Sequence, residues 1–125
     1  MKRLQNGDKI LSKSMLDVME TDPNKDVRKS ALENVLVSKE NLPFIIRRTR
    51  DISDEVRTEA YNVLSEKVGL KHLTVPQRVA LIEWGLKDRS QKVQESCKKM
   101  ICKFWMRKYT DIVTFLKLFD ITEFE

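Results

Sequence analysis

The residues whose chemistry stands out are cations gathered toward the end of the chain. Six lysines and arginines fall between residues 92 and 108, against one acidic residue, Glu95. Cations in a row along a helix bind the phosphates of a nucleic-acid backbone, with an affinity that falls as salt rises. The alternative is a solvated outer face that keeps the protein soluble. The six candidate DNA-binding residues are Lys92, Lys98, Lys99, Lys103, Arg107 and Lys108.

A second group of candidate DNA-binding residues consists of Arg47, Arg48 and Arg50. These arginines close an expected helix over residues 41–49, where positive charge also stabilises the negative end of the helix dipole. The structural role and a contact with DNA or a protein partner both remain open at this point.

The sequence offers no motif for catalysis. It contains only 3 glycines, too few for a phosphate-cradling loop, and no nucleophile elbow or paired carboxylates of defensible geometry. His72 has no metal-ligating residue at a suitable spacing. We therefore expect no enzyme activity, cofactor, metal or small-molecule substrate. Cys97 and Cys102 lie five residues apart, about 140° around a helix, which predicts free, packed thiols in a reducing compartment.

Composition restricts the class of protein. Hydrophobic residues make up 41% and charged residues 34% of the 125 residues, and the net charge of +5 is modestly basic. No apolar run approaches the roughly 18 residues needed to cross a bilayer, and the first residues lack the apolar core of a secretory signal. These features predict a non-membrane protein of the cytosol or nucleus.

A sequence pattern that occurs three times predicts the helices that position these cations. Each copy begins with an aspartate, with valine five residues later, a small residue nine later and an aliphatic or similar residue thirteen later. The copies begin at Asp22, Asp51 and Asp88, so they are offset by 29 and 37 residues. Each aspartate marks a turn, and Asn24, Ser53 and Ser90 are natural N-caps for the helices that follow.

A first helix precedes each of these turns, so the chain is predicted to form antiparallel helix hairpins. We expect hairpins over approximately 9–38, 39–68 and 74–105, a further helix over 110–119, and the longest loop near residues 67–72. No such helix buries its apolar stripe alone, whereas stacked hairpins do. The predicted fold is therefore an all-α solenoid of the HEAT or armadillo type, with about three and a half repeats in one unit spanning 1–125.

The apolar stripes predict which side chains are buried. In the second copy the stripe is Val56, Ala60, Val63, Leu64 and Val68. In the third copy the stripe is Val93, Cys97, Met100, Ile101 and Phe104. The helix that precedes the third copy is expected to bury Val79, Ile82 and Leu86.

An aspartate with an arginine six residues later and a buried valine between them resembles the HEAT-repeat signature. In that family, these aspartates and arginines form a hydrogen-bonded ladder along the solenoid, which the resemblance assigns to Asp22, Arg28, Asp51, Arg57 and Asp88. The third copy departs from the signature, because Gln94 occupies the arginine position. The ladder is therefore expected to weaken or end there.

A narrower resemblance joins the chain to the HEAT-repeat subunits of condensin known as the G subunits, or condensin subunit 3. It is carried by residues 42–51, 56–61 and 64–68, and by residues 76–79 through 85–90, and it covers roughly residues 20–108. The family's proteins are far longer, so the chain is expected to be an internal fragment or an unusually short relative.

The resemblance implies functions that composition does not. Such subunits bind duplex DNA without regard to sequence, together with the kleisin subunit, in mitotic chromosome condensation. Their ATPase belongs to the SMC partner subunits. The implied location is the nucleus and chromosomes, with a cytoplasmic pool. A general protein-interaction scaffold, such as a transport receptor or a phosphatase scaffold, is the alternative, since HEAT repeats serve all of these.

Overall fold

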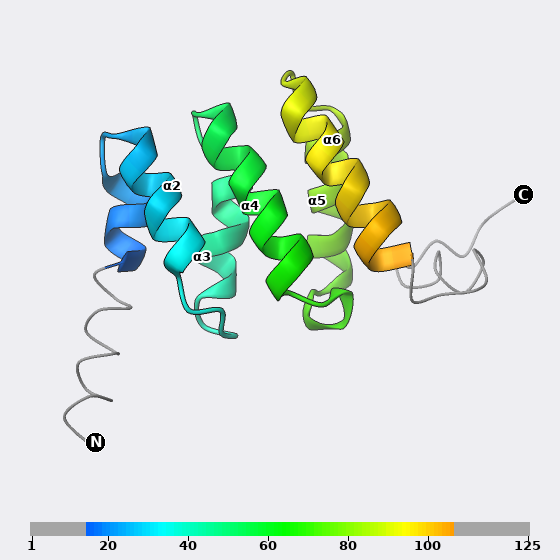
Figure 1. Ribbon diagram of the computed structural model, residues 1–125. Coiled ribbons are helices and arrows are strands. Elements are labelled where there is room, and N and C mark those ends of the chain that lie inside the picture. The colour runs from blue at the N-terminus through cyan, green and yellow to red at the C-terminus, as the bar shows by residue number, and fades with distance from the viewer. Residues whose placement is uncertain (1–14, 107–125) are drawn as a thin grey trace, which may run out of the picture. The chain divides into compact units, whose positions relative to one another are not determined.

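The computed structural model describes residues 15–106, and in this range it contains helices and loops but no strand. Residues 15–21 are helical and are followed by α2 (Lys25–Asn34), α3 (Leu42–Arg47), the 3₁₀ turn η1 (Arg48–Arg50) and α4 (Asp54–Lys67). Next come the 3₁₀ turn η2 (Leu70–His72), α5 (Val75–Leu86), α6 (Gln91–Lys99) and the π-helical turn η3 (Met100–Trp105) (Figure 1). The all-α prediction is confirmed for these residues. The start of the first hairpin and the helix predicted over 110–119 lie outside them.

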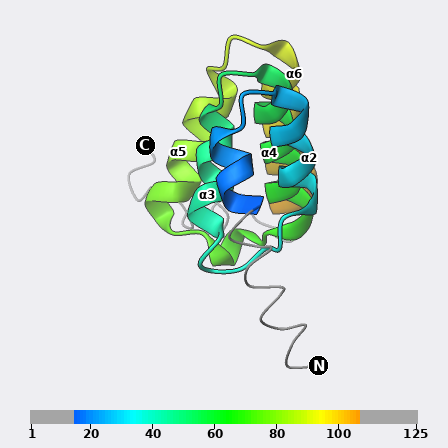
Figure 2. The ribbon, with the colours of Figure 1, turned by 90° about the vertical axis from the view of Figure 1, so that its left-hand side faces the viewer.

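The chain forms two compact units, and the boundary between them falls within α4, after Ala60. In the first unit, α2 and α3 lie in separate layers (Figure 2). The side chain of Asn24 accepts a hydrogen bond from the backbone N–H of Asp26 and so caps α2, as predicted. The fully buried apolar side chains of this unit include Met19, Leu32, Ile45 and Val56.

In the second unit, α5 lies behind α6 (Figure 1). Helix α5 begins with a reciprocal cap, in which Thr74 and Gln77 each bond the other's backbone N–H, and with a proline in its first turn. Tyr61 is fully buried, and its hydroxyl donates to the carbonyl oxygen of Leu81 at 2.7 Å.

The buried face of α5 differs from the prediction. Val79 and Leu86 are 40% and 42% exposed, and the buried positions are Leu81 and Gly85. The cause is a close approach of α6: a Cβ atom on Gly85 would lie 2.3 Å from Sγ of Cys97. A glycine adds no apolar side chain, so the apolar periodicity of the sequence does not indicate that Gly85 sets the packing of α5 against α6.

The prediction for the last buried residues of the third copy is also wrong. Val93, Cys97 and Met100 are fully buried as predicted, but the next buried residue is Trp105 rather than Ile101 or Phe104. The π-helical turn contains one residue more than an α-turn, so the buried face continues five residues after Met100. Within the same turn Cys102 is exposed, so its predicted packing role is wrong, whereas Cys97 is buried.

The valine of the first copy is a further exception. Val56 and Val93 are fully buried, but Val27 is 40% exposed. It lines an open groove beside Met15 and Val18. The buried stripe of the second copy is confirmed in full, since all five of its members are buried.

Candidate nucleic-acid interface

Four of the six predicted cations of the third repeat lie in the described part of the chain. Burial of Val93 and Cys97 turns the opposite side of α6 to solvent, and Lys92, Lys98 and Lys99 are exposed there. Lys103 is exposed on the π-helical turn. Arg107 and Lys108 lie outside the described residues.

None of these four lysines takes part in an ion pair or hydrogen bond with another residue of the described range 15–106. The single carboxylate in their sequence neighbourhood, Glu95, accepts a hydrogen bond from the side chain of Gln91 at 3.3 Å. Among the described residues, a ligand of these ammonium groups would therefore have no ion pair to displace.

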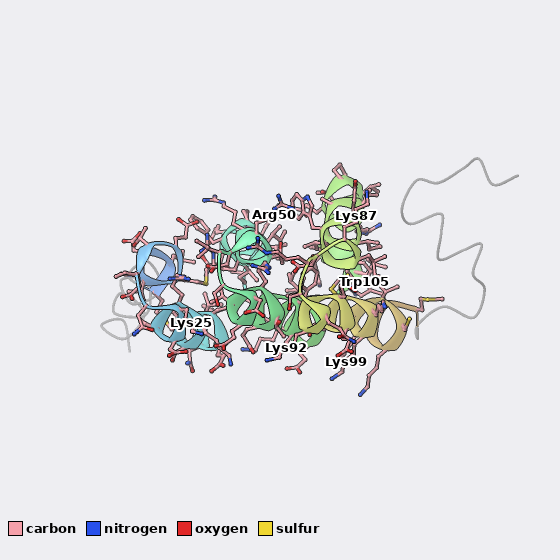
Figure 3. The ribbon with its side chains drawn as sticks, turned by 90° about the horizontal axis from the view of Figure 1, so that it is seen from above. Lys25, Arg50, Lys87, Lys92, Lys99 and Trp105 are labelled. Atoms are coloured by element: carbon pink, nitrogen blue, oxygen red, sulfur yellow. The ribbon has the colours of Figure 1, made fainter. Side chains whose placement is uncertain are left out.

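Three of the lysines share one side of the helix. At about 100° per residue, Lys92 and Lys99 differ by about 20° around α6, and Lys103 follows Lys99 by close to one turn. Figure 3 shows Lys92 and Lys99 projecting from the same side of α6, away from α5. Lys98 lies about 120° from Lys92. We refer to Lys92, Lys99 and Lys103 as the lysine ridge.

The arginines of the second cluster are engaged within the first unit. Nη1 of Arg47 donates to Oε1 of Glu20 at 2.8 Å, and its guanidinium lies 4.6 Å from the ring centroid of Phe44. Arg48 is mostly buried and donates to Asp51 at 2.7 Å. Arg50 is exposed on the α3 side of its unit (Figure 3). A ligand of Arg47 or Arg48 would have to compete with these contacts.

Asp51 is the centre of a buried charge network. Arg28 donates to both of its carboxylate oxygens, at 3.1 and 3.0 Å, and Arg48 and the backbone N–H of Ser53 supply further donors. Burial of the carboxyl raises its pKa, but the hydrogen bonds from Arg28 and Ser53 and the charges of Arg28 and Arg48 outweigh it. The pKa of Asp51 is therefore lowered. The Arg28–Asp51 pair joins the first and second sequence copies.

Each of the three turns repeats the same internal bonds. The carboxylates of Asp22, Asp51 and Asp88 accept from the backbone N–H two residues later. The residue six positions after each aspartate donates to that aspartate's carbonyl oxygen. The donors are Arg28, Arg57 and Gln94. Gln94 therefore keeps the bond within its turn, although it lacks the charge with which Arg28 also pairs with the carboxylate of Asp51.

The described residues contain no cluster of three histidine, cysteine or acidic side chains that could hold a metal ion. Within them, no helix has the length and apolar character required to cross a membrane. Burial raises the pKa of the Cys97 thiol to about 12, so this cysteine is neutral and unreactive at physiological pH.

No protein-family model matches the chain. Among curated proteins it is similar to condensin complex subunit 3 of Xenopus laevis, with 37% identity over 112 residues, or 89% of this chain. The human protein of the same name is 39% identical over 72% of the chain, and that of Schizosaccharomyces pombe is 31% identical over 86%. The chain spans only 11%, 9% and 13% of the length of these relatives.

The structure is similar to a solved one, the crystal structure of the S. pombe condensin Cnd3–Cnd2 subcomplex. The TM-score is 0.84 at 30% identity, over 88% of this chain and 15% of the matched chain. The predicted HEAT-type fold and the predicted resemblance to condensin subunit 3 are both confirmed.

Proposed function

We propose that this chain is a non-catalytic HEAT-repeat segment of a condensin regulatory subunit, and that it binds duplex DNA and a kleisin subunit during mitotic chromosome condensation. Its place of action is then the nucleus and chromosomes. The similarity to condensin subunit 3 along most of the chain supports the family role. The observation that carries DNA binding is the lysine ridge, whose ammonium groups are exposed and form no ion pair within residues 15–106.

The proposed contact is with the phosphate backbone rather than with base edges. Lys92 and Lys103 are eleven residues apart, which corresponds to about 16 Å of helix, or roughly five base-pair steps of duplex. Lysine presents a point charge on a flexible stem, which suits phosphates and gives no bidentate readout of bases. Binding is therefore expected to be independent of sequence.

The ridge is tested by removing two of its charges. In the intact protein, Lys92→Ala with Lys99→Ala should weaken binding to a duplex of about 30 base pairs roughly tenfold at 0.1 M salt. Loss of two phosphate contacts should also reduce the slope of log affinity against log salt by about 1.8. Affinity is measured by fluorescence anisotropy across a salt series, with two duplexes of unrelated sequence.

The matched control is Lys71→Ala with Lys98→Ala, which removes the same charge from two exposed lysines outside the ridge that have no ion-pair partner in the described part of the chain. This variant should bind within about twofold of wild type, because its lysines make no phosphate contact in the proposed mode. Equal weakening by both pairs would mean that net charge alone matters. A wild-type affinity that does not respond to salt would contradict backbone binding.

A further inference from the structure

Ser96 lies on the flank of α6 beside the lysine ridge. It is half-buried, about 40° around the helix from Lys92 and about 60° from Lys99. Its hydroxyl makes no hydrogen bond with any residue of the described range. The hydroxyls of Thr58 and Ser65, also within a helix, instead donate to the carbonyl oxygen four residues earlier.

The surroundings of this hydroxyl favour an added anion. Lys92 lies four residues before it and Lys99 three residues after it, positions whose Cβ atoms are about 5–6 Å away on a helix surface. Within residues 15–106 neither ammonium group has an ion-pair partner, while the nearby Glu95 is bonded to Gln91. A phosphate on Ser96 would therefore meet two cations and displace no ion pair of the described residues.

We infer that Ser96 is a phosphorylation site that switches off DNA-backbone binding by the lysine ridge. This inference rests on the proposed function. In the reaction, the hydroxyl oxygen of Ser96 attacks the terminal phosphorus of a nucleoside triphosphate bound to a protein kinase. The bond to the bridging oxygen breaks, nucleoside diphosphate leaves, and the hydroxyl proton passes to a base of the kinase.

The switch acts through charge. A phosphoserine carries about −1.5 to −2 at neutral pH, which cancels about half to two-thirds of the +3 of the ridge. It also pairs with the ammonium groups of Lys92 and Lys99, which would otherwise bind DNA phosphates. The kinase reaches the hydroxyl when the short helix α6 opens locally, which requires less free energy than global unfolding.

The electrostatic effect is tested in the intact protein with phosphoserine placed at position 96 by site-specific incorporation. Affinity for a 30-base-pair duplex should fall about tenfold at 0.1 M salt, with a shallower salt dependence. Phosphoserine at Ser30, an exposed position on α2, is the control for added charge and should change affinity less than about twofold. Ser96→Ala should bind as wild type, because the hydroxyl itself makes no contact.

Unchanged affinity with phosphoserine at position 96 would overturn the inference, as would an equal loss from both phosphorylated positions. If the unmodified protein fails to bind duplex DNA, the proposed function fails first. This outcome is distinguishable, because no variant then has an affinity to lose.

The modification itself is tested by mass spectrometry of the intact protein from cells with condensed chromosomes and from interphase cells. Trypsin cleaves after Lys92 and Lys98 and releases residues 93–98, in which Ser96 is the one hydroxyl residue. We expect this peptide to carry one phosphate in one of the two cell states. Its unmodified form alone, in both states, would overturn the assignment.

Discussion

At the scale of single residues, Asp51 links several parts of the first unit through hydrogen bonds and ion pairs. Its carboxylate accepts hydrogen bonds from Arg28, Arg48 and the N–H of Ser53, and its backbone carbonyl accepts from Arg57. The side chain is 1% exposed, so water does not replace a lost partner. Removing the carboxylate charge would leave the guanidinium of Arg28 buried without its counterion.

Asp51→Asn should therefore lower the free energy of unfolding by about 3 kcal/mol, measured by urea denaturation at pH 7. Asp17→Asn, at an exposed position, should change it by less than about 0.5 kcal/mol. The pKa of Asp51 is lowered from its ordinary value of 3.8, so its stabilising effect is complete above that pH. The difference between wild type and Asp51→Asn should shrink as pH falls below 3.8. A difference that stays constant down to pH 3 would contradict the lowered pKa.

The turn aspartates were predictable from sequence because their spacing is local. Asp22, Asp51 and Asp88 bond to groups two and six residues away, so a repeated sequence pattern reports them directly. The role of Arg48 was missed. Its bond to Asp51 depends on the 3₁₀ turn η1 that brings it over the carboxylate, whereas three arginines within four residues favoured an exposed basic cluster.

At the scale of elements, the contact between α5 and α6 is governed by Gly85. The absent side chain leaves room for Cys97, whose Sγ lies 3.8 Å from the carbonyl oxygen of Leu81. The hydroxyl of Tyr61 bonds the same carbonyl, so three elements meet at this point of the second unit. Apolar periodicity predicted α5 but assigned its buried side to Val79 and Leu86, because hydrophobicity does not register a close backbone approach.

Gly85→Ala should lower the free energy of unfolding by about 1–3 kcal/mol, because the new methyl group would overlap Cys97 and Tyr61. Gly69→Ala is the matched control. There a Cβ atom would have no neighbour closer than 3.4 Å, and that neighbour is the side chain of His72. The control should be neutral or slightly stabilising, since alanine restricts the unfolded chain more than glycine does. Equal destabilisation by both substitutions, measured by thermal and urea unfolding, would argue against close packing at Gly85.

At the scale of the whole molecule, the chain corresponds to a short part of the much longer proteins that it resembles. It spans about a tenth of the length of condensin complex subunit 3 from Xenopus and human. The solved neighbour is a subcomplex of two subunits, and this chain covers 15% of the matched one.

We accordingly expect a kleisin subunit to co-precipitate with this chain, as the proposed function requires. The measurement is a pull-down from cell extract with quantitative immunoblotting. The Lys92→Ala and Lys99→Ala pair, made in the intact protein, should leave the kleisin signal unchanged. Recovery of transport or phosphatase subunits in place of a kleisin would favour the general scaffold instead.

The π-helical turn at the end of α6 bears on how this chain is compared with others. It holds one residue more than an α-turn while keeping Met100 and Trp105 on the buried side. An insertion of a single amino acid is thereby confined to one turn, and Trp105 stays in phase with the buried residues before the turn. A homologue with one residue fewer here would keep the same buried face. An alignment guided by helical periodicity alone would misplace the positions from Ile101 to Trp105 by one, and the correct gap belongs between residues 100 and 105.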